Sequence, residues 1–216
     1  MPKTAIILGA SGLTGGLLLQ QLLKDNRYDC IKLFGRSKVS VEHQKVQQFT
    51  GDLFQMDAFS KDFTGDEVFC CIGTTKKKTP DEEQYRKIDL GIPESAAQMC
   101  EQNKIKTFAV ISSVGADAKS SNFYLKTKGE MENAVLSKNI PNILILRPSL
   151  IVGDRDERRM GERISIWFMK VLNPLLFGSL KKYRSIKAEK IAAGMILLAN
   201  SKKNQQIFQS NEIQAL

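Results

Sequence analysis

Histidine and cysteine are scarce in this sequence, and neither occurs in a pattern that suits catalysis or metal binding. The single histidine, His43, lies in a polar stretch, so a catalytic dyad or triad built on histidine has no support. The four cysteines, which lack the spacing of metal ligands, are Cys30, Cys70, Cys71 and Cys100. We expect reduced, buried thiols and no metal site.

Long apolar runs are also absent from the sequence. No segment approaches the roughly 20 apolar residues that cross a bilayer. The first apolar run, Ala5 to Leu8, is interrupted by Gly9 and is too short for a signal peptide. The sequence therefore predicts a cytoplasmic protein without a transmembrane segment.

Basic residues outnumber acidic ones by 32 to 23, and the formal net charge is +9. The lysines are scattered, with small clusters at Lys76 to Lys78, Lys181 with Lys182, and Lys202 with Lys203. No aromatic residues are interleaved with them as in a base-stacking surface. We therefore expect no nucleic-acid partner and interpret the charge as a basic mouth that attracts a phosphorylated cofactor.

The stretch Ala5 to Leu23 has the order of a strand, a glycine turn and a helix. A helix start carries unpaired N–H groups and partial positive charge, so a glycine turn before it suits a pyrophosphate. The spacing is G-x-x-G-x-x-G, which places one more residue in the turn than G-x-G-x-x-G does. A purely structural turn is the alternative. The candidate cofactor residues here are Gly9, Ser11, Gly12, Leu13, Thr14 and Gly15.

A second strand, Cys30 to Phe34, is followed by Arg36 and Ser37. In NAD-binding proteins an acidic residue about 20 positions after the glycines binds the ribose 2′-OH. An arginine stands at that position here and suits a 2′-phosphate through charge-assisted bonds. NADP(H) is therefore favoured over NAD(H), with an exposed basic loop as the alternative.

Strands and helices alternate along the rest of the chain. The further strands are predicted at Lys45 to Thr50, Val68 to Ile72, Thr107 to Ile111, Asn142 to Leu146 and Gln206 to Phe208. The helices are predicted at Asp81 to Asn103 with a break or kink at Pro93, from the SSNFY segment to Leu136, and at Ala188 to Ala199. This alternation predicts one α/β domain over residues 1–216, with a doubly wound, mostly parallel sheet in three α/β/α layers.

Small or polar residues follow most of these strands. Ligands of such sheets bind beyond the carboxyl ends of the strands, so these residues should meet at one crevice. Asp52 is placed either to bond the adenine amino group or to cap the next turn. The other candidate cofactor residues after strands are Leu53, Ile72, Gly73, Thr74, Thr75 and Pro148.

Tyr124 and Lys128 are four residues apart in a predicted helix and so share one face. A tyrosine exchanges a proton near neutral pH only if its pKa, about 10 in isolation, is lowered. Lowering this pKa by about three units requires roughly 4 kcal/mol. A lysine ammonium about 4 Å from the phenol oxygen supplies roughly that energy. Ser113, after the neighbouring strand, could hold a substrate oxygen. The alternative is that the tyrosine packs, the lysine is solvated and the serine caps a helix.

The segments GASGLTG, SSVGAD, YLKTK and LRPSLIVG together resemble the short-chain dehydrogenase/reductase superfamily in its atypical or extended branch. The runs SSVGADAKSSNFYLKTKGEME and LRPSLIVGDRDERRMGE are similar to the subgroup of Tat-interacting oxidoreductase-like proteins. The resemblance covers nearly the whole chain. It implies a Rossmann fold, NADP(H), and Ser113, Tyr124 and Lys128 as the catalytic set. It also implies that Lys128 holds the nicotinamide ribose and that Pro148 and Ile151 border the nicotinamide.

Two departures from the family pattern bear on the site. Ser112 rivals Ser113, and only about ten residues separate the serine from the tyrosine, as expected of a short substrate loop. The usual active-site asparagine has no clear counterpart.

The favoured function is hydride transfer to or from a carbonyl or alcohol. The alternative is a non-catalytic NADP(H) sensor that acts through a protein partner.

Residues 149–187 are expected to form a small substrate-side subdomain. It begins with a polar loop, Val152 to Glu162, expected over the site. Within it, the apolar stretch Ile164 to Leu180 is interpreted as a wall of the substrate pocket in preference to a membrane-surface segment or a dimer interface. The sequence leaves a homo-oligomer open.

Overall fold

The computed structural model describes residues 2–153, 178–201 and 205–216. Its main feature is a seven-stranded parallel sheet with the strand order β3-β2-β1-β4-β5-β6-β9. The strands are β1 (Lys3–Leu8), β2 (Tyr28–Gly35), β3 (Val46–Thr50), β4 (Glu67–Cys70), β5 (Thr107–Ile111), β6 (Asn142–Arg147) and β9 (Ile207–Gln209). This is the order of a Rossmann sheet with one added strand, so the predicted fold class is confirmed.

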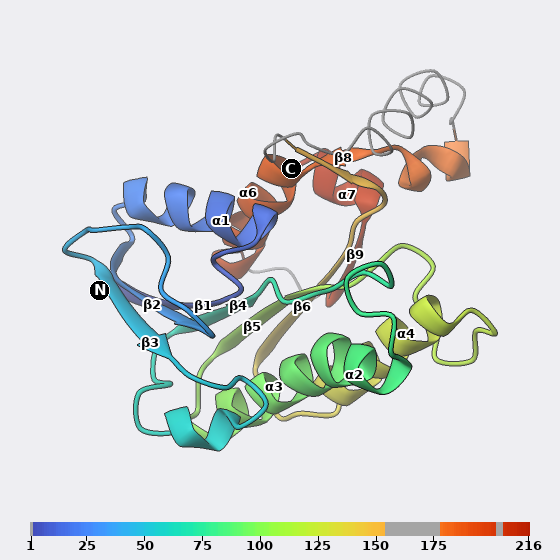
Figure 1. Ribbon diagram of the computed structural model, residues 1–216. Coiled ribbons are helices and arrows are strands. Elements are labelled where there is room, and N and C mark those ends of the chain that lie inside the picture. The colour runs from blue at the N-terminus through green and yellow to red at the C-terminus, as the bar shows by residue number, and fades with distance from the viewer. Residues whose placement is uncertain (1, 154–177, 202–204) are drawn as a thin grey trace.

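Helices cover both faces of the sheet (Figure 1). On one face lie α1 (Leu13–Lys24), α6 (Ala188–Ala199) and α7 (Ser210–Gln214). On the other lie α2 (Glu82–Arg86), α3 (Ile92–Gln102) and α4 (Phe123–Leu136), together with the 3₁₀ turn η1 (Met56–Phe59). A second 3₁₀ segment, η4 (Gly178–Tyr183), precedes the short strand β8 (Ile186–Lys187).

Alternate residues of the strands supply two separate cores. In β1, Ala5 and Ile7 pack with α1 and α6, whereas Ile6 and Leu8 pack with α3 and α4. This alternation follows from the two-residue period of a strand, and strands covered on both faces are apolar on both. Cys70 lies in the second core and the adjacent Cys71 packs against the first.

All four cysteines are free thiols, as predicted, although burial differs among them. Cys70 and Cys100 are buried, and Cys30 and Cys71 are only partly buried.

The helix predicted over Asp81 to Asn103 is divided by a π-helical turn, η2 (Lys87–Gly91). Asp81 caps the N-terminus of α2 by accepting a hydrogen bond from Gln84 N. Pro93 lies in the first turn of α3, directly after the π-helical turn, and the backbone stays helical through Gly91 and Ile92. The interruption therefore comes just before the proline.

The segment 149–187 is described only at its two ends. There β7 (Ile151–Val152) pairs with β8 in a separate two-stranded parallel sheet, so the ends of the segment lie side by side. The predicted loop over 152–162, from residue 154 onward, and the apolar stretch 164–180, up to residue 177, lie outside the described residues. The substrate-side subdomain stays a prediction.

Candidate functional site

The glycine turn joins β1 to α1 through two close backbone contacts. Gly9 has a φ of +88°, and a Cβ there would lie 2.9 Å from the Cys71 carbonyl oxygen. A Cβ on Gly15 would lie 2.2 Å from the Gly9 carbonyl oxygen. Gly9 is required because of its positive φ and its contact with Cys71, and Gly15 is required because a side chain there would push α1 away from the turn.

Within the described part of the chain, no side chain caps the N-terminus of α1. Gly12 is the N-cap, makes no side-chain cap, and no acidic residue lies in the first turn. The N–H groups of this turn have no partners within the helix and carry partial positive charge. Gly12, Leu13 and the buried Thr14 thus belong to a turn that fits a phosphate.

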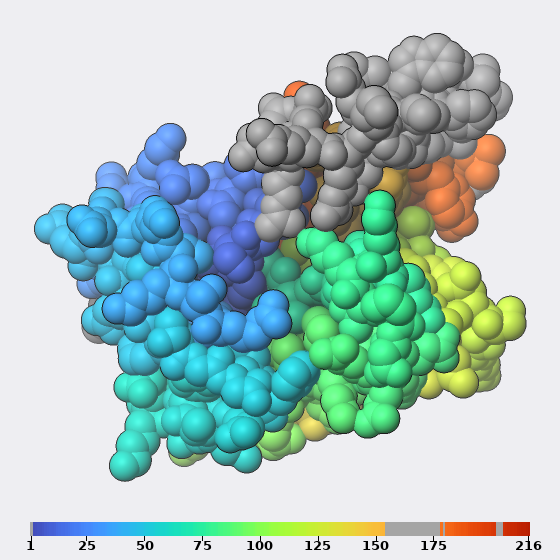
Figure 2. Space-filling model, viewed as in Figure 1, coloured from blue at the N-terminus to red at the C-terminus, as the bar shows by residue number. Residues whose placement is uncertain are grey.

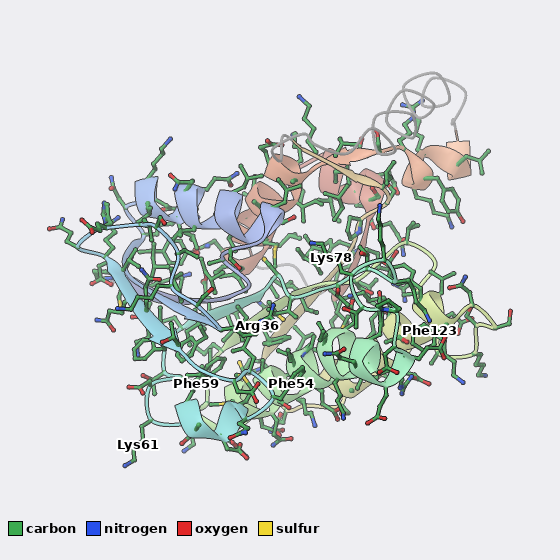
Figure 3. The ribbon with its side chains drawn as sticks, in the orientation of Figure 1. Arg36, Phe54, Phe59, Lys61, Lys78 and Phe123 are labelled. Carbon is green, nitrogen blue, oxygen red and sulfur yellow. The ribbon has the colours of Figure 1, made fainter. Side chains whose placement is uncertain are left out.

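A hollow lies beside this turn, where β1, β2 and β3 end. The predicted cofactor residues that line it are Gly9, Ser11, Arg36, Ser37, Leu53 and Ile72. Figure 3 shows Arg36 at the end of β2, toward the middle of the molecule. Among the described residues, Arg36 has no ion-pair partner. An exposed guanidinium in such a hollow is suited to a phosphate group.

Asp52 lies outside this hollow, after β3, and lines a neighbouring surface depression. Its Oδ1 accepts a hydrogen bond of 2.9 Å from Phe54 N. Asp52 therefore caps the turn that leads to η1, which is one of the two alternatives from the sequence. A bond to adenine stays a prediction.

The other end of the crevice follows β4. Gly73 is exposed there, and a Cβ on it would lie 3.6 Å from Asp89 Oδ1 and 4.0 Å from Lys128 Nζ. Thr74 N donates a hydrogen bond of 2.7 Å to Asp89 Oδ2, and the Thr74 and Thr79 hydroxyls are 2.9 Å apart. The segment that contains Gly73, Thr74 and the exposed Thr75 is thus tied to the π-helical turn.

The lysine of the predicted catalytic set is buried rather than solvated. Lys128 Nζ lies 2.7 Å from Asp89 Oδ1, with 5% and 1% of the two side chains exposed. Burial alone would lower the pKa of Lys128, but the charges of Asp89 and, to a lesser extent, Tyr124 outweigh it, and the pKa is raised. The ammonium therefore stays charged at neutral pH.

Tyr124 is 37% exposed, on the second residue of α4 and one helical turn before Lys128. Asn122 caps α4 by accepting a hydrogen bond from Leu125 N. Lys76 Nζ lies 4.1 Å from the centre of the Phe123 ring, next to the tyrosine. Phe123 at the start of α4 and Lys78 in the loop after β4 can be followed in Figure 3.

The two serines after β5 have different surroundings. Ser112 Oγ donates a hydrogen bond of 2.5 Å to the buried Glu132 Oε1, and Arg147 Nε donates to the same oxygen at 2.8 Å. Among the described residues, the one hydrogen bond of Ser113 Oγ is a long one of 3.3 Å, donated to the Val114 carbonyl oxygen. The Ser112 hydroxyl is therefore engaged by a buried carboxylate, whereas that of Ser113 is held less firmly.

The remaining predicted residues follow β6. The Pro148 carbonyl oxygen accepts a hydrogen bond of 2.9 Å from Val114 N, which ties the ends of β5 and β6 together. Ile151 lies in β7, is partly buried, and packs against the core between the sheet and helices α1 and α6. Because the sheet is parallel, the ends of β1, β2, β4, β5 and β6 lie at one edge. In Figure 2 the blue segments near the N-terminus and the green segments from the middle of the chain lie next to each other on the face shown.

Asp89 and Glu132 were missed from the sequence. Asp89 lies one helical turn after Tyr85, and both residues are 1% exposed. An acidic residue on the predicted buried face of a helix indicates a buried carboxylate, and a buried carboxylate needs a charged or hydrogen-bonding partner. The sequence pattern therefore indicates a buried Asp89, but it does not identify the partner, Lys128, which is distant in sequence.

Among the residues that the structure describes, no cluster of histidine, cysteine and acidic side chains could hold a metal ion. Within the same ranges, every helix is too short or too polar to cross a membrane.

Residues 9–163 match the NAD(P)H-binding family. Protein HTATIP2 from Rattus norvegicus is 35% identical over 164 residues, which cover 74% of this chain and 67% of that protein. Protein FMP52, mitochondrial, from Meyerozyma guilliermondii is 34% identical over 155 residues, 70% of this chain and 66% of that protein. The matched parts thus span about two thirds of these relatives.

Solved structures share the fold at low sequence identity. UDP-glucuronic acid 4-epimerase from Bacillus cereus in complex with NAD has a TM-score of 0.70 and 19% identity, covering 95% of this chain and 77% of that one. MoeE5 in complex with UDP-glucose and NAD has a TM-score of 0.70 and 14% identity, covering 98% and 80%. The fold is that of NAD(P)-binding, oxidoreductase-like Rossmann proteins.

The expectation of a cytoplasmic protein is contradicted by these comparisons, because the FMP52 relatives are named mitochondrial. A cellular address is read by receptors and is not set by composition or fold, so the lack of a signal-peptide pattern does not identify the compartment.

The fold and the matched residues agree with the resemblance seen in the sequence. The chain belongs to the NAD(P)H-binding family, with HTATIP2 and FMP52 among its relatives.

Proposed function

We propose that this chain is an NADP(H)-dependent oxidoreductase that transfers hydride to or from a carbonyl or alcohol, with Tyr124 as the acid and base. The observation that carries the proposal is a buried, charged Lys128 one helical turn from an exposed Tyr124. Burying an ammonium is costly, and a purely structural lysine at this position would be replaceable by an apolar residue. Its place beneath Gly73, at the carboxyl edge of the sheet, supports a role toward a bound ligand.

The residues present fit the cofactor. The N-terminus of α1, which has no side-chain cap, suits the pyrophosphate, and Arg36 with Ser37 suits a 2′-phosphate at the adenosine end. Gly73, Thr74, Thr75, Pro148 and Ile151 are proposed to border the nicotinamide end. When bound, NADP(H) supplies or accepts the hydride.

The side chains of the chain itself handle the proton. In the reducing direction, Ser113 donates a hydrogen bond to the carbonyl oxygen of the substrate, and Tyr124 transfers its phenolic proton to that oxygen. Lys128 stabilises the tyrosinate that remains and holds the nicotinamide ribose hydroxyls. Asp89 keeps the ammonium in place. Residues 149–187 are proposed to complete the substrate side.

The test is NADPH and NADH binding by fluorescence, followed by turnover on a mixed panel of aldehydes and ketones. Tyr124→Phe should lower turnover by about 100-fold or more while NADPH affinity stays nearly the same. Lys128→Met should lower turnover and weaken NADPH binding. Lys126 is an exposed lysine of the same helix, and Lys126→Met should change neither turnover nor NADPH binding. Unchanged turnover in Tyr124→Phe would rule out this mechanism.

The alternative is an NADP(H) sensor that acts through a protein partner. It would be marked by tight NADPH binding without turnover anywhere on the panel, and by partner binding that depends on the redox state of the cofactor.

A further inference from the structure

The segment 36–42 follows the carboxyl end of β2, in the connection that leads to β3, and has no helix or strand of its own. Arg36, Ser37 and Lys38 are exposed at its start, beside the hollow already described. Irregular backbone has no regular partners for its N–H and C=O groups, so something else must hold it in one conformation. Arg36 directly follows Gly35 of β2, so Ser37 and Lys38 connect it to the part of the segment that needs this anchor.

The Gln48 side chain is the anchor. Gln48 Oε1 accepts a hydrogen bond of 2.9 Å from Val39 N, and Gln48 Nε2 donates to the carbonyl oxygens of Val39 at 3.2 Å and Val41 at 3.4 Å. Val41 N in turn donates to the Val39 carbonyl oxygen at 2.8 Å. The amide thus satisfies both backbone groups of Val39, as a neighbouring strand would.

Gln48 is partly buried and pairs in register with Leu33 of β2. Val39, Val41 and Val46 pack against the core that contains Leu33. A partly buried amide is unfavourable unless it is hydrogen-bonded, and the segment supplies partners to both the nitrogen and the oxygen of the Gln48 amide. Its amide is therefore committed to the protein, although the residue lines the hollow with Arg36.

We propose that Gln48 is a positioning residue for cofactor specificity, which holds the 36–42 segment so that Arg36 and Ser37 meet the 2′-phosphate of NADP(H). The inference rests on the proposed function, because it assigns a cause to the preference for NADP(H). Gln48 acts through the segment and does not itself contact the phosphate. NADH lacks this phosphate, so a displaced segment weakens NADPH binding and leaves NADH binding nearly unchanged.

The test compares NADPH and NADH dissociation constants in Gln48→Met, Arg36→Ala and the wild type. Methionine matches glutamine in length but cannot make the three hydrogen bonds, so the NADPH preference should fall by about 5- to 10-fold. The matched control is Gln47→Met, on the adjacent exposed residue of β3, which should keep the preference. Gln48→Asn, one methylene shorter, is the second variant and should lose preference as well.

Hydrogen exchange gives a readout without the cofactor. The Val39 amide should exchange faster in Gln48→Met than in Gln47→Met, because its acceptor is removed. A preference unchanged in both Gln48 variants, with Arg36→Ala lowering it, overturns the role of Gln48 and leaves the NADP(H) preference standing. A preference unchanged in Arg36→Ala overturns the proposed recognition of NADP(H), and the role of Gln48 with it.

Discussion

Lys128 Nζ and Asp89 Oδ1 lie 2.7 Å apart, and both side chains are almost fully buried. The contact is thus a buried ion pair at hydrogen-bonding distance. Asp89 comes from the π-helical turn and Lys128 from α4, and the pair joins these elements beneath Gly73. The lysine of the proposed catalytic set is thereby fixed by a residue that is distant in sequence.

Replacing one partner of this pair should be strongly destabilising. We expect Asp89→Asn to lower the free energy of unfolding by about 3–5 kcal/mol, because a buried ammonium is left without its counter-charge. Asparagine can still accept the hydrogen bond from Thr74 N, so the loss of stability measures the effect of removing the negative charge of Asp89. Urea unfolding at neutral pH measures it.

The control for this prediction is the exposed ion pair of Lys87 with Glu83, which also spans 2.7 Å. Glu83→Gln should leave stability unchanged, because solvent screens an exposed pair. The double variant Asp89→Asn with Lys128→Met should recover part of the loss. Equal effects of Asp89→Asn and Glu83→Gln would contradict a stabilising buried pair.

The same pair predicts how stability depends on pH. Asp89 outweighs the effect of burial and raises the pKa of Lys128 above its ordinary value of 10.5. A raised pKa gives stability that is fully present below the unfolded-state pKa and is lost as pH rises through the folded-state pKa. The difference in unfolding free energy between wild type and Asp89→Asn should therefore be largest at neutral pH and shrink as the pH rises past 10.5, the ordinary pKa of lysine. A difference that grows with alkaline pH would contradict the assignment.

The local sequence pattern was sufficient to predict most helices and strands and the glycine turn of the candidate site. The strand Thr107–Ile111 and the helix Ala188–Ala199 have the predicted ends, because polar or small residues border clear apolar patterns. Gly9 and Gly15 could be read as backbone requirements, since the turn that needs them is local.

Side-chain pairing between elements could not be predicted in this way. The partners Asp89 and Lys128 are far apart in the chain, and so are Ser112 and Glu132. Their contacts depend on how η2, α4 and the end of β5 pack, and a single sequence has no period that reveals such packing. The compartment likewise depends on recognition outside the fold, so the composition gave the wrong answer.

The two serines should separate into a structural and a functional residue. On a substrate from the carbonyl panel, Ser113→Ala should lower turnover by about 100-fold, because it removes a donor to the substrate oxygen. Ser112→Ala should keep most of the turnover and lower the unfolding free energy by about 1–3 kcal/mol, since Glu132 loses a hydrogen bond. Steady-state kinetics and urea unfolding of both variants measure this. The reverse pattern would make Ser112 the active serine.

The last prediction concerns two adjacent glycines of α1. A Cβ on Gly15 would lie 2.2 Å from the Gly9 carbonyl oxygen and 2.8 Å from its carbonyl carbon, and backbone atoms cannot move aside without opening the turn. Gly15→Ala should therefore weaken NADPH binding by about 10-fold or more and lower the unfolding free energy by about 1–3 kcal/mol.

Gly16→Ala is the matched control for that change. A Cβ on Gly16 would lie 3.3 Å from the Ala10 carbonyl oxygen, which a shift of a few tenths of an ångström relieves, and alanine favours the helix by about 1 kcal/mol. We expect stability and NADPH affinity within about 0.5 kcal/mol of the wild type. Fluorescence titration and urea unfolding compare the two variants. If Gly15→Ala binds NADPH as the wild type does, the turn opens without loss, and it cannot be the rigid pyrophosphate cradle on which the proposed cofactor site depends.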